Sequence, residues 1–256
     1  MIDEPIPFTL HLEELRKRLM IAGGAWLLAF FACYSFAEPL FLYISNPLRE
    51  VLPEGSSLVF LTATEPFFTY LKIAAMAALV VSLPVILWQV WAFVAPGLHT
   101  HEKRFGVAFV ASSCLFFSVG TYFGFTFIFP LILSVLIQFG LGAGGVSAML
   151  SMDGYLSLAL HLLLAFGIVF ELPVVIVLLA RLGVVDHLWL RQNRKYMVIV
   201  AFVFGAIFTP GPDVFSQCAL AIPFVILYEV GIVGARIFGR RIEAKTTFPP
   251  SSFRES

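Results

Sequence analysis

Charged residues are scarce in this sequence. Asp, Glu, Lys and Arg make up 12% of its 256 residues, while 60% of the residues are hydrophobic and the mean hydropathy is +0.95. A chain with so few polar side chains cannot cover the surface of a soluble globule, so the composition predicts an integral membrane protein. The formal net charge is zero, and no basic field or acidic tail indicates nucleic acid as a partner.

Sequence motifs of catalysis and metal binding are absent as well. The sequence contains no HExxH, no Gly-x-Ser-x-Gly, no pair of intramembrane aspartates and no phosphate-binding loop, so we expect neither an enzyme nor a bound cofactor. The three cysteines lie in apolar stretches without metal-like spacing to histidine, and we interpret them as small hydrophobic residues. The acidic, proline-containing start does not resemble a cleavable signal peptide, so we expect the first span to remain in the mature protein.

Long runs without charge predict six membrane spans. An α-helix rises about 1.5 Å per residue, so about 20 apolar residues cross a hydrocarbon core about 30 Å thick. The expected spans cover about residues 19–37, 70–94, 105–137, 154–180, 196–208 and 214–235. The fifth run is too short for such a core. We expect residues 1–238 to form a single membrane domain and residues 239–256 to form a tail that is disordered at its end.

The segment before the first span predicts a short interfacial helix. Leucines recur at helical spacing over residues 9–19, so we expect an amphipathic helix that lies in the membrane interface. Glu13 and Glu14 stand four residues before Lys17 and Arg18, which is the spacing of ordinary ion pairs on one helix. Either these pairs neutralise their own helix, or a carboxylate here receives a cationic partner.

Basic residues lie almost entirely on one side of the six expected spans. Of the sixteen lysines and arginines, fourteen fall in the N-terminal segment, the second and fourth connections and the tail, and only Arg49 and Lys72 fall on the other side. Because positively charged loops stay in the cytoplasm, this distribution predicts that both termini are cytoplasmic.

A few ionisable residues fall inside the expected spans. An ionisable group at membrane depth is costly and is normally retained for a partner, a pathway or a proton, which makes Glu171 a candidate functional residue. The alternative is a carboxyl that burial keeps neutral and that is hydrogen-bonded to hydroxyls or to backbone groups freed by Pro173. We interpret Glu229 as an interface-level residue and His161 as a polar residue with its hydrogen bonds satisfied.

Carboxylates also meet at the cytoplasmic face. Glu13 and Glu14 belong to the interfacial helix, and Glu102 lies in a short loop on the same side of the membrane. Carboxylates in this setting could accept bidentate guanidinium groups from a ligand, because the planar fork of arginine matches a carboxylate. The pattern permits such a ligand without requiring it.

Several short motifs point to a known family. They are HLEELRKRL at 11–19, SNPL at 45–48, PVILWQVWAFVAPGL at 84–98, HEKR at 101–104, FELP at 170–173 and TPGPDVFSQ at 209–217. In this order the chain resembles, over nearly its whole length, the TatC subunit of the bacterial twin-arginine protein translocase.

The resemblance implies both a fold and a function. The fold is an all-α, cup-shaped bundle of six transmembrane helices with both termini cytoplasmic and short fifth and sixth helices. The function is that of a receptor for the twin-arginine signal peptides of folded proteins, and of the core of the proton-gradient-driven translocase that exports them across the bacterial cytoplasmic (inner) membrane. Expected partners are TatA-type and TatB-type single-span subunits against spans five and six, membrane lipid, and further copies of the chain in the receptor complex.

The resemblance also assigns roles to particular residues. Those implied in signal-peptide binding are Glu14, Glu102, Arg16 and Phe93. Glu171 would be a polar intramembrane site on the concave side that contacts partners, and Pro47 and Asp213 occupy extracytoplasmic motif positions. Considered without the resemblance, the residues leave open a proton-coupled transporter of small solutes that uses Glu171, or an intramembrane hydrolase.

Overall fold

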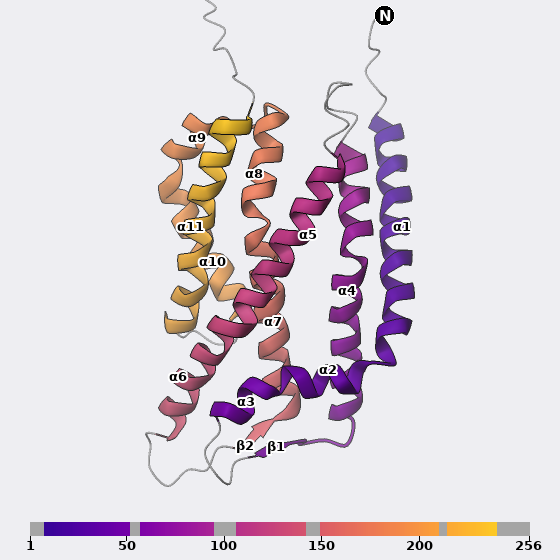
Figure 1. Cartoon of the computed structure of the whole chain (residues 1–256), viewed down its shortest axis with the longest axis vertical. Helices are drawn as coiled ribbons and strands as arrows, with labels where there is room; N and C mark the ends of the chain where they lie inside the picture. The colour runs from indigo at the N-terminus through magenta and orange to yellow at the C-terminus, as the bar shows by residue number, and fades with distance from the viewer. Residues whose placement is uncertain (1–7, 52–56, 95–105, 142–148, 210–213, 240–256) are drawn as a thin grey trace, which may run out of the picture.

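The computed structural model describes residues 8–51, 57–94, 106–141, 149–209 and 214–239 as an upright bundle of long helices (Figure 1). The helices are α1 (Phe8–Tyr34), α2 (Ala37–Ile44), α3 (Asn46–Val51), α4 (Glu65–Val94), α5 (Gly106–Phe123), α6 (Phe129–Leu141), α7 (Met152–Phe170), α8 (Leu172–Arg181), α9 (His187–Gln192), α10 (Arg194–Phe208) and α11 (Val214–Phe238). A π-helical turn, η3 (Gly124–Ile128), joins α5 to α6, and the two strands are β1 (Ser57–Val59) and β2 (Met149–Ser151).

Five helical segments in these ranges are long and apolar enough to cross a membrane. They are His11–Tyr34, Glu65–Val94, Gly106–Phe139, Met152–Arg181 and Val214–Phe238. The sixth span, α11, has 25 residues, so the short sixth helix that the resemblance implied is not found. The fifth span, α10, has 15 residues. At about 1.5 Å per residue it is about 22 Å long and falls short of a normal hydrocarbon core, as expected for the fifth span.

Helix α1 corrects one prediction. We expected a separate interfacial helix over residues 9–19, but α1 runs without a break for 27 residues and lies beside α4 (Figure 1). The sequence from 8 to 34 contains no proline, so nothing interrupts the backbone hydrogen bonds between the charged turns and the apolar ones. The indole N–H of Trp26 donates to the carbonyl of Ala75 (3.1 Å) and joins α1 to α4.

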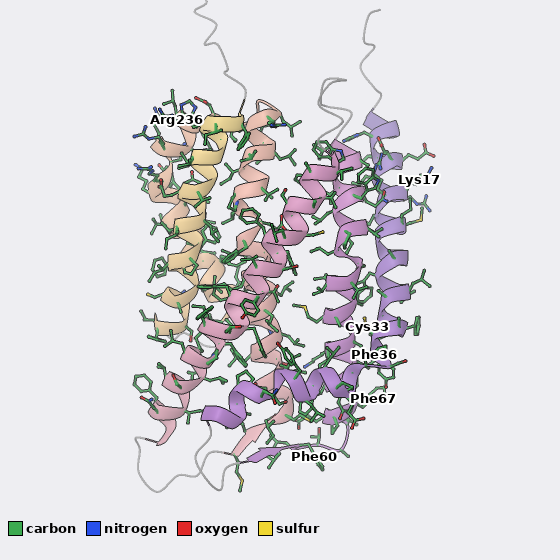
Figure 2. The ribbon with its side chains drawn as sticks, viewed as in Figure 1. Lys17, Cys33, Phe36, Phe60, Phe67 and Arg236 are labelled. Carbon is green, nitrogen blue, oxygen red and sulfur yellow. The ribbon has the colours of Figure 1, made fainter. Side chains whose placement is uncertain are left out.

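The start of α1 and the end of α11 lie at the same end of the bundle, which we call the terminal face (Figure 1). Strands β1 and β2 lie at the opposite end, the distal face. Lys17 and Arg236 lie toward the terminal face, whereas Phe60 and Phe67 lie at the distal face (Figure 2).

The distal face contains a strand pair that the sequence did not predict. β1 and β2 pair in parallel, with Ser57 opposite Met149. Each strand has three residues, too few for a period-2 pattern to stand out from the apolar background. The pair joins the chain after α3 to the chain before α7, so it ties two connections at this face together.

Glu65, the first residue of α4, strengthens the same junction. One carboxylate oxygen accepts the backbone N–H groups of Leu61 (2.6 Å) and Thr62 (3.4 Å). The other accepts the hydroxyl of Ser151 (2.6 Å) and the backbone N–H of Asp153 (2.7 Å). A single buried carboxylate therefore holds both connections of the distal face.

The third span contains the π-helical turn. Pro130 has no backbone N–H to donate to the carbonyl of Thr126, which accounts for an irregular turn at this point. The fourth span is two helices in line, because α7 ends at Phe170 and α8 begins at Leu172, with Pro173 in its first turn.

Helix α7 forms the centre of the core. Its buried side chains include Leu156, Ala159, Leu162, Phe166 and Val169. Helix α5 crosses it closely at Gly120 and Gly167, where a Cβ atom would lie 2.5 Å from the Phe166 carbonyl oxygen and from the Phe117 ring, respectively. Small residues at such crossings let helix backbones approach in a membrane.

Candidate functional site

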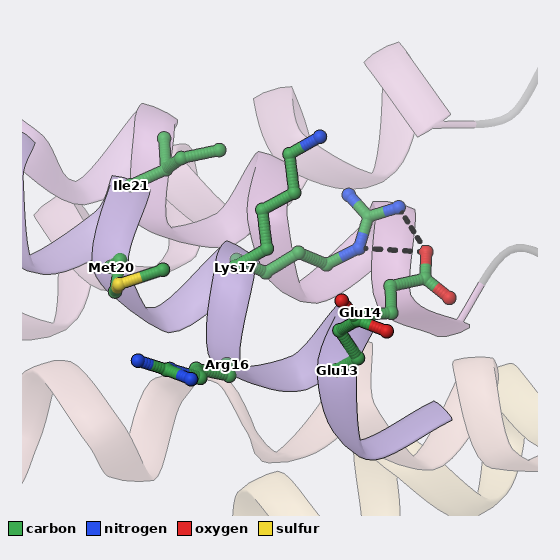
Figure 3. Close-up of a pocket in the computed structure, with 7 residues that line it drawn as sticks. Glu13, Glu14, Arg16, Lys17, Met20 and Ile21 are labelled. Atoms are coloured by element: carbon green, nitrogen blue, oxygen red, sulfur yellow. Dashed lines mark hydrogen bonds and ion pairs between the residues drawn. The ribbon is translucent and has the colours of Figure 1, made fainter. Parts of the chain in front are cut away.

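The charged turns of α1 border an open pocket of about 560 Å³ near the terminal face. Its lining residues are Glu13, Glu14, Arg16, Lys17, Arg18, Met20 and Ile21. Since α1 is helical through this stretch, residues four apart lie on one face, and Figure 3 shows Glu13 and Glu14 close together with Arg16 and Lys17 beside them.

Glu14 and Arg18 form an ion pair in this pocket. Nε and Nη2 of Arg18 both donate to the same oxygen of Glu14, at 3.0 and 2.5 Å (Figure 3). The two side chains are 34% and 24% exposed, respectively, so the pair contributes at most about 1 kcal/mol to stability. Nη1 of Arg18 also donates to the side-chain oxygen of Gln89 on α4 (3.5 Å).

The second expected pair does not form. Within the part of the chain that the structure describes, Glu13 and Lys17 make no ion pair with each other, and both side chains are exposed. Arg16 points away from the Glu14 carboxylate (Figure 3). The i,i+4 spacing therefore predicted one of two pairs correctly.

Phe93 lies beside the start of α1. Its ring, in the last turn of α4, stacks on the ring of His11 with 4.3 Å between the centroids. His11 lies about one helical turn before Glu14 on α1, so the contact brings Phe93 to the end of α1 that carries Glu14. The sequence alone does not predict a role for His11 or Gln89, because their contacts depend on how α1 packs against α4. Glu102 lies outside the described residues.

Glu171 occupies the break between α7 and α8. Its side chain is half-buried, and one carboxyl oxygen is shielded from solvent without a hydrogen-bond partner among the described residues. The hydroxyl of Ser113 on α5 lies close to it and is itself unpartnered there. Ser113 is nevertheless a hydroxyl donor of the kind that the alternative expectation requires, so both expectations for Glu171 stay open.

Glu229 and His161, the other ionisable residues discussed within the expected spans, have local partners. Glu229 pairs with Arg194 of α10 (2.6 Å), and both side chains are more than 40% exposed. Nδ1 of His161 lies 2.6 Å from the carbonyl oxygen of Ser157, so one ring nitrogen is hydrogen-bonded.

Pro47 is buried in the first turn of α3. Asp213 lies outside the described residues.

The fold and site together define a polytopic helical membrane protein with a charged, open pocket at one end. Among the described residues, no group of three or more His, Cys, Asp or Glu could hold a metal ion. The sequence model of the family described as "Sec-independent protein translocase protein (TatC)" matches residues 10–223.

Relatives and solved structures agree with that match. The Sec-independent protein translocase protein TatC of Desulforapulum autotrophicum is 42% identical over 93% of this chain and 87% of its own length. The TatC protein of Escherichia coli strain K12 is 40% identical over 93% of this chain and 91% of its own. A crystal structure described as the twin-arginine translocase receptor TatC is 38% identical, covers 90% of this chain and all of its own, and superposes with a TM-score of 0.81.

This chain belongs to the TatC family. The matches confirm the expected resemblance, the all-α membrane fold and the assignment to Sec-independent protein translocation.

Proposed function

We propose that this protein is the receptor for twin-arginine signal peptides and the core of a translocase that moves folded proteins across the bacterial cytoplasmic membrane, driven by the proton gradient. Family membership supports this function over solute transport or hydrolysis. The observation that carries it in the structure is the Glu14 carboxylate. Arg18 occupies one of its oxygens, while no hydrogen bond from a described residue reaches the other, and Glu14 lines the open pocket.

The orientation supports the same proposal. Fourteen of the sixteen basic residues fall on the side of the N-terminus, and α1 begins at the same end of the bundle where α11 ends. By the positive-inside rule, the terminal face is cytoplasmic. A signal peptide would then meet the Glu14 pocket before it entered the membrane.

The expected site residues take the following roles in the proposal. Glu14 and Glu102 bind the two arginines of the signal, since paired carboxylates accept guanidinium forks. Phe93 packs beside this site through His11, and Arg16 contributes charge at its edge. Glu171 is the polar intramembrane contact.

Two further positions belong to the opposite side of the membrane. Pro47 and Asp213 shape the extracytoplasmic connections in the proposal. For Pro47, burial in the first turn of α3 at the distal end of the bundle supports this role.

Helices α10 and α11 would receive the single-span TatA-type and TatB-type partners. The outward residues of α10 are apolar and exposed, as in Ile199 (60%) and Val203 (54%), and the same holds for Ile222 (60%) and Ile226 (58%) of α11. A helix of 15 residues leaves part of the bilayer thickness unspanned, which a partner helix could complete. Further copies of the chain would assemble in the same receptor complex.

Site-specific crosslinking tests the receptor function. We expect a photoreactive group at position 17, on the pocket, to capture a peptide that contains two consecutive arginines. A group at position 28 on the same helix is the matched control, because Leu28 is 76% exposed and does not line the pocket. Equal capture at both positions, or capture at position 28 alone, would place the peptide elsewhere.

A further inference from the structure

The Glu14 pocket already contains a guanidinium group. Arg18 approaches Glu14 with two N–H donors, which is the chemistry that an arginine of a bound peptide would offer. Both donors go to one oxygen, and the pair is only partly shielded from water. The contact is therefore weak enough to be exchanged.

Arg18 and an incoming arginine would compete for the same carboxylate, that of Glu14. A guanidinium that binds a carboxylate in the bidentate, fork-to-fork manner uses both oxygens. On Glu14, one of these oxygens carries both bonds from Arg18. A second guanidinium would also stand next to a like charge. Bidentate binding of a ligand to Glu14 therefore requires Arg18 to leave.

Arg18 has a second acceptor within reach. Its Nη1 atom already lies 3.5 Å from the side-chain oxygen of Gln89 on α4, a neutral group across the helix pair. After release from Glu14, the guanidinium can keep this hydrogen bond, so that it is not left without a protein partner.

We propose that Arg18 is an internal competitor for the signal-peptide site, a positioning residue that occupies Glu14 in the empty receptor and is displaced by an arginine of the ligand. The inference rests on the proposed function and adds a regulation of the same site. Occupation by Arg18 raises the dissociation constant of every cationic ligand, so weak and nonspecific cations stay unbound while a ligand with additional contacts displaces it.

Peptide titration against the full-length protein in nanodiscs tests the competitor. The probe is a fluorescent peptide with two consecutive arginines, and the variants are Arg18→Gln, Arg18→Lys and Lys17→Gln. Lys17→Gln is the matched control, since it removes one positive charge from the same pocket at a side chain that does not bind Glu14. It therefore measures the general effect of charge.

Arg18→Gln should tighten binding about two- to fivefold beyond Lys17→Gln, which corresponds to the free energy of a partly exposed ion pair. Arg18→Lys should fall between wild type and Arg18→Gln, because an ammonium group keeps the charge but lacks the fork. If Arg18→Gln binds no better than Lys17→Gln, or binds worse than wild type, Arg18 is not a competitor.

A Glu14→Ala variant in the same titration separates the two proposals. If Glu14→Ala binds as wild type does, the proposed binding role of Glu14 is wrong, whatever Arg18 does. If Glu14→Ala weakens binding while Arg18→Gln fails to strengthen it, only the competitor is refuted. Far-UV circular dichroism and the elution volume of each variant show that the fold is kept.

Discussion

Two carboxylates of this protein are held in opposite ways. Glu65 uses both oxygens to accept four hydrogen bonds at the distal face, whereas an oxygen of Glu171 is buried without a partner among the described residues. A fully satisfied carboxylate stabilises its surroundings, and an unsatisfied one costs free energy that is tolerated for function. The contrast indicates a structural role for Glu65 and supports the proposed functional role of Glu171.

The first prediction concerns Glu65. Glu65→Ala removes the common acceptor of two connections and leaves their donors without a partner, so the thermal unfolding midpoint in detergent should fall by at least about 3 °C. Glu38→Ala on α2 is the control, because that side chain is exposed and should leave the midpoint unchanged. Equal midpoints for the two variants would mean that Glu65 does not hold the distal face.

Glu171 gives the opposite prediction. Glu171→Gln keeps the shape of the side chain, so stability should stay within about 1 kcal/mol of wild type, while export of a twin-arginine reporter should drop at least tenfold. Reporter activity in the periplasm and thermal unfolding of the purified variant give the two values. A destabilised variant with normal export would instead make Glu171 a structural residue.

At the scale of elements, the charge-free runs predicted where the membrane helices lie. They did not predict where α1 begins, or the contacts between distant segments. The boundaries of α1 were missed because helix propensity continues through its charged turns, and the strand pair and the hydrogen bonds of Glu65 join segments far apart in sequence. Glu14 was expected from a motif. The contacts of Arg18 at this site could be foreseen only in part, since i,i+4 spacing covers the one with Glu14 and tertiary packing decides the one with Gln89.

The close crossing of α5 and α7 provides the element-scale prediction. In Gly120→Ala the new Cβ would lie 2.5 Å from a backbone carbonyl oxygen, so the helices must separate and the variant should lose about 1–3 kcal/mol of stability. Gly23→Ala in α1 is the matched control, because no atom lies within 4 Å of its Cβ position, and helix propensity should make it neutral or slightly stabilising. A similar unfolding midpoint for both variants would contradict tight packing at Gly120.

At the scale of the whole molecule, three features support the proposed orientation, in which the terminal face is cytoplasmic. They are the charge distribution, the common end of α1 and α11, and the pocket around Glu14. The pocket lies toward the terminal face (Figure 2), and the outer surfaces of α1, α10 and α11 expose many apolar side chains. The family match supports six membrane helices, although only five helices in the described ranges are long enough by themselves to span a bilayer.

Labelling with a membrane-impermeant maleimide tests the orientation. In a variant whose three native cysteines are replaced by alanine, Lys17→Cys and Arg236→Cys should react only when the cytoplasmic side is open. Phe60→Cys should react in intact spheroplasts, because Phe60 is 66% exposed and lies at the distal face (Figure 2). The reverse pattern would place the Glu14 pocket on the wrong side for a receptor.

The most direct test of the account compares Glu14 with its neighbour. Each of Glu14→Gln and Glu13→Gln removes one negative charge from the pocket, so long-range electrostatics change alike in the two variants. We predict that Glu14→Gln weakens binding of a twin-arginine peptide at least about tenfold, as expected for a lost charge-assisted hydrogen bond, while Glu13→Gln changes the dissociation constant less than about threefold. Equal effects of the two variants, or a larger effect of Glu13→Gln, would contradict the assignment of Glu14 as a signal-peptide ligand.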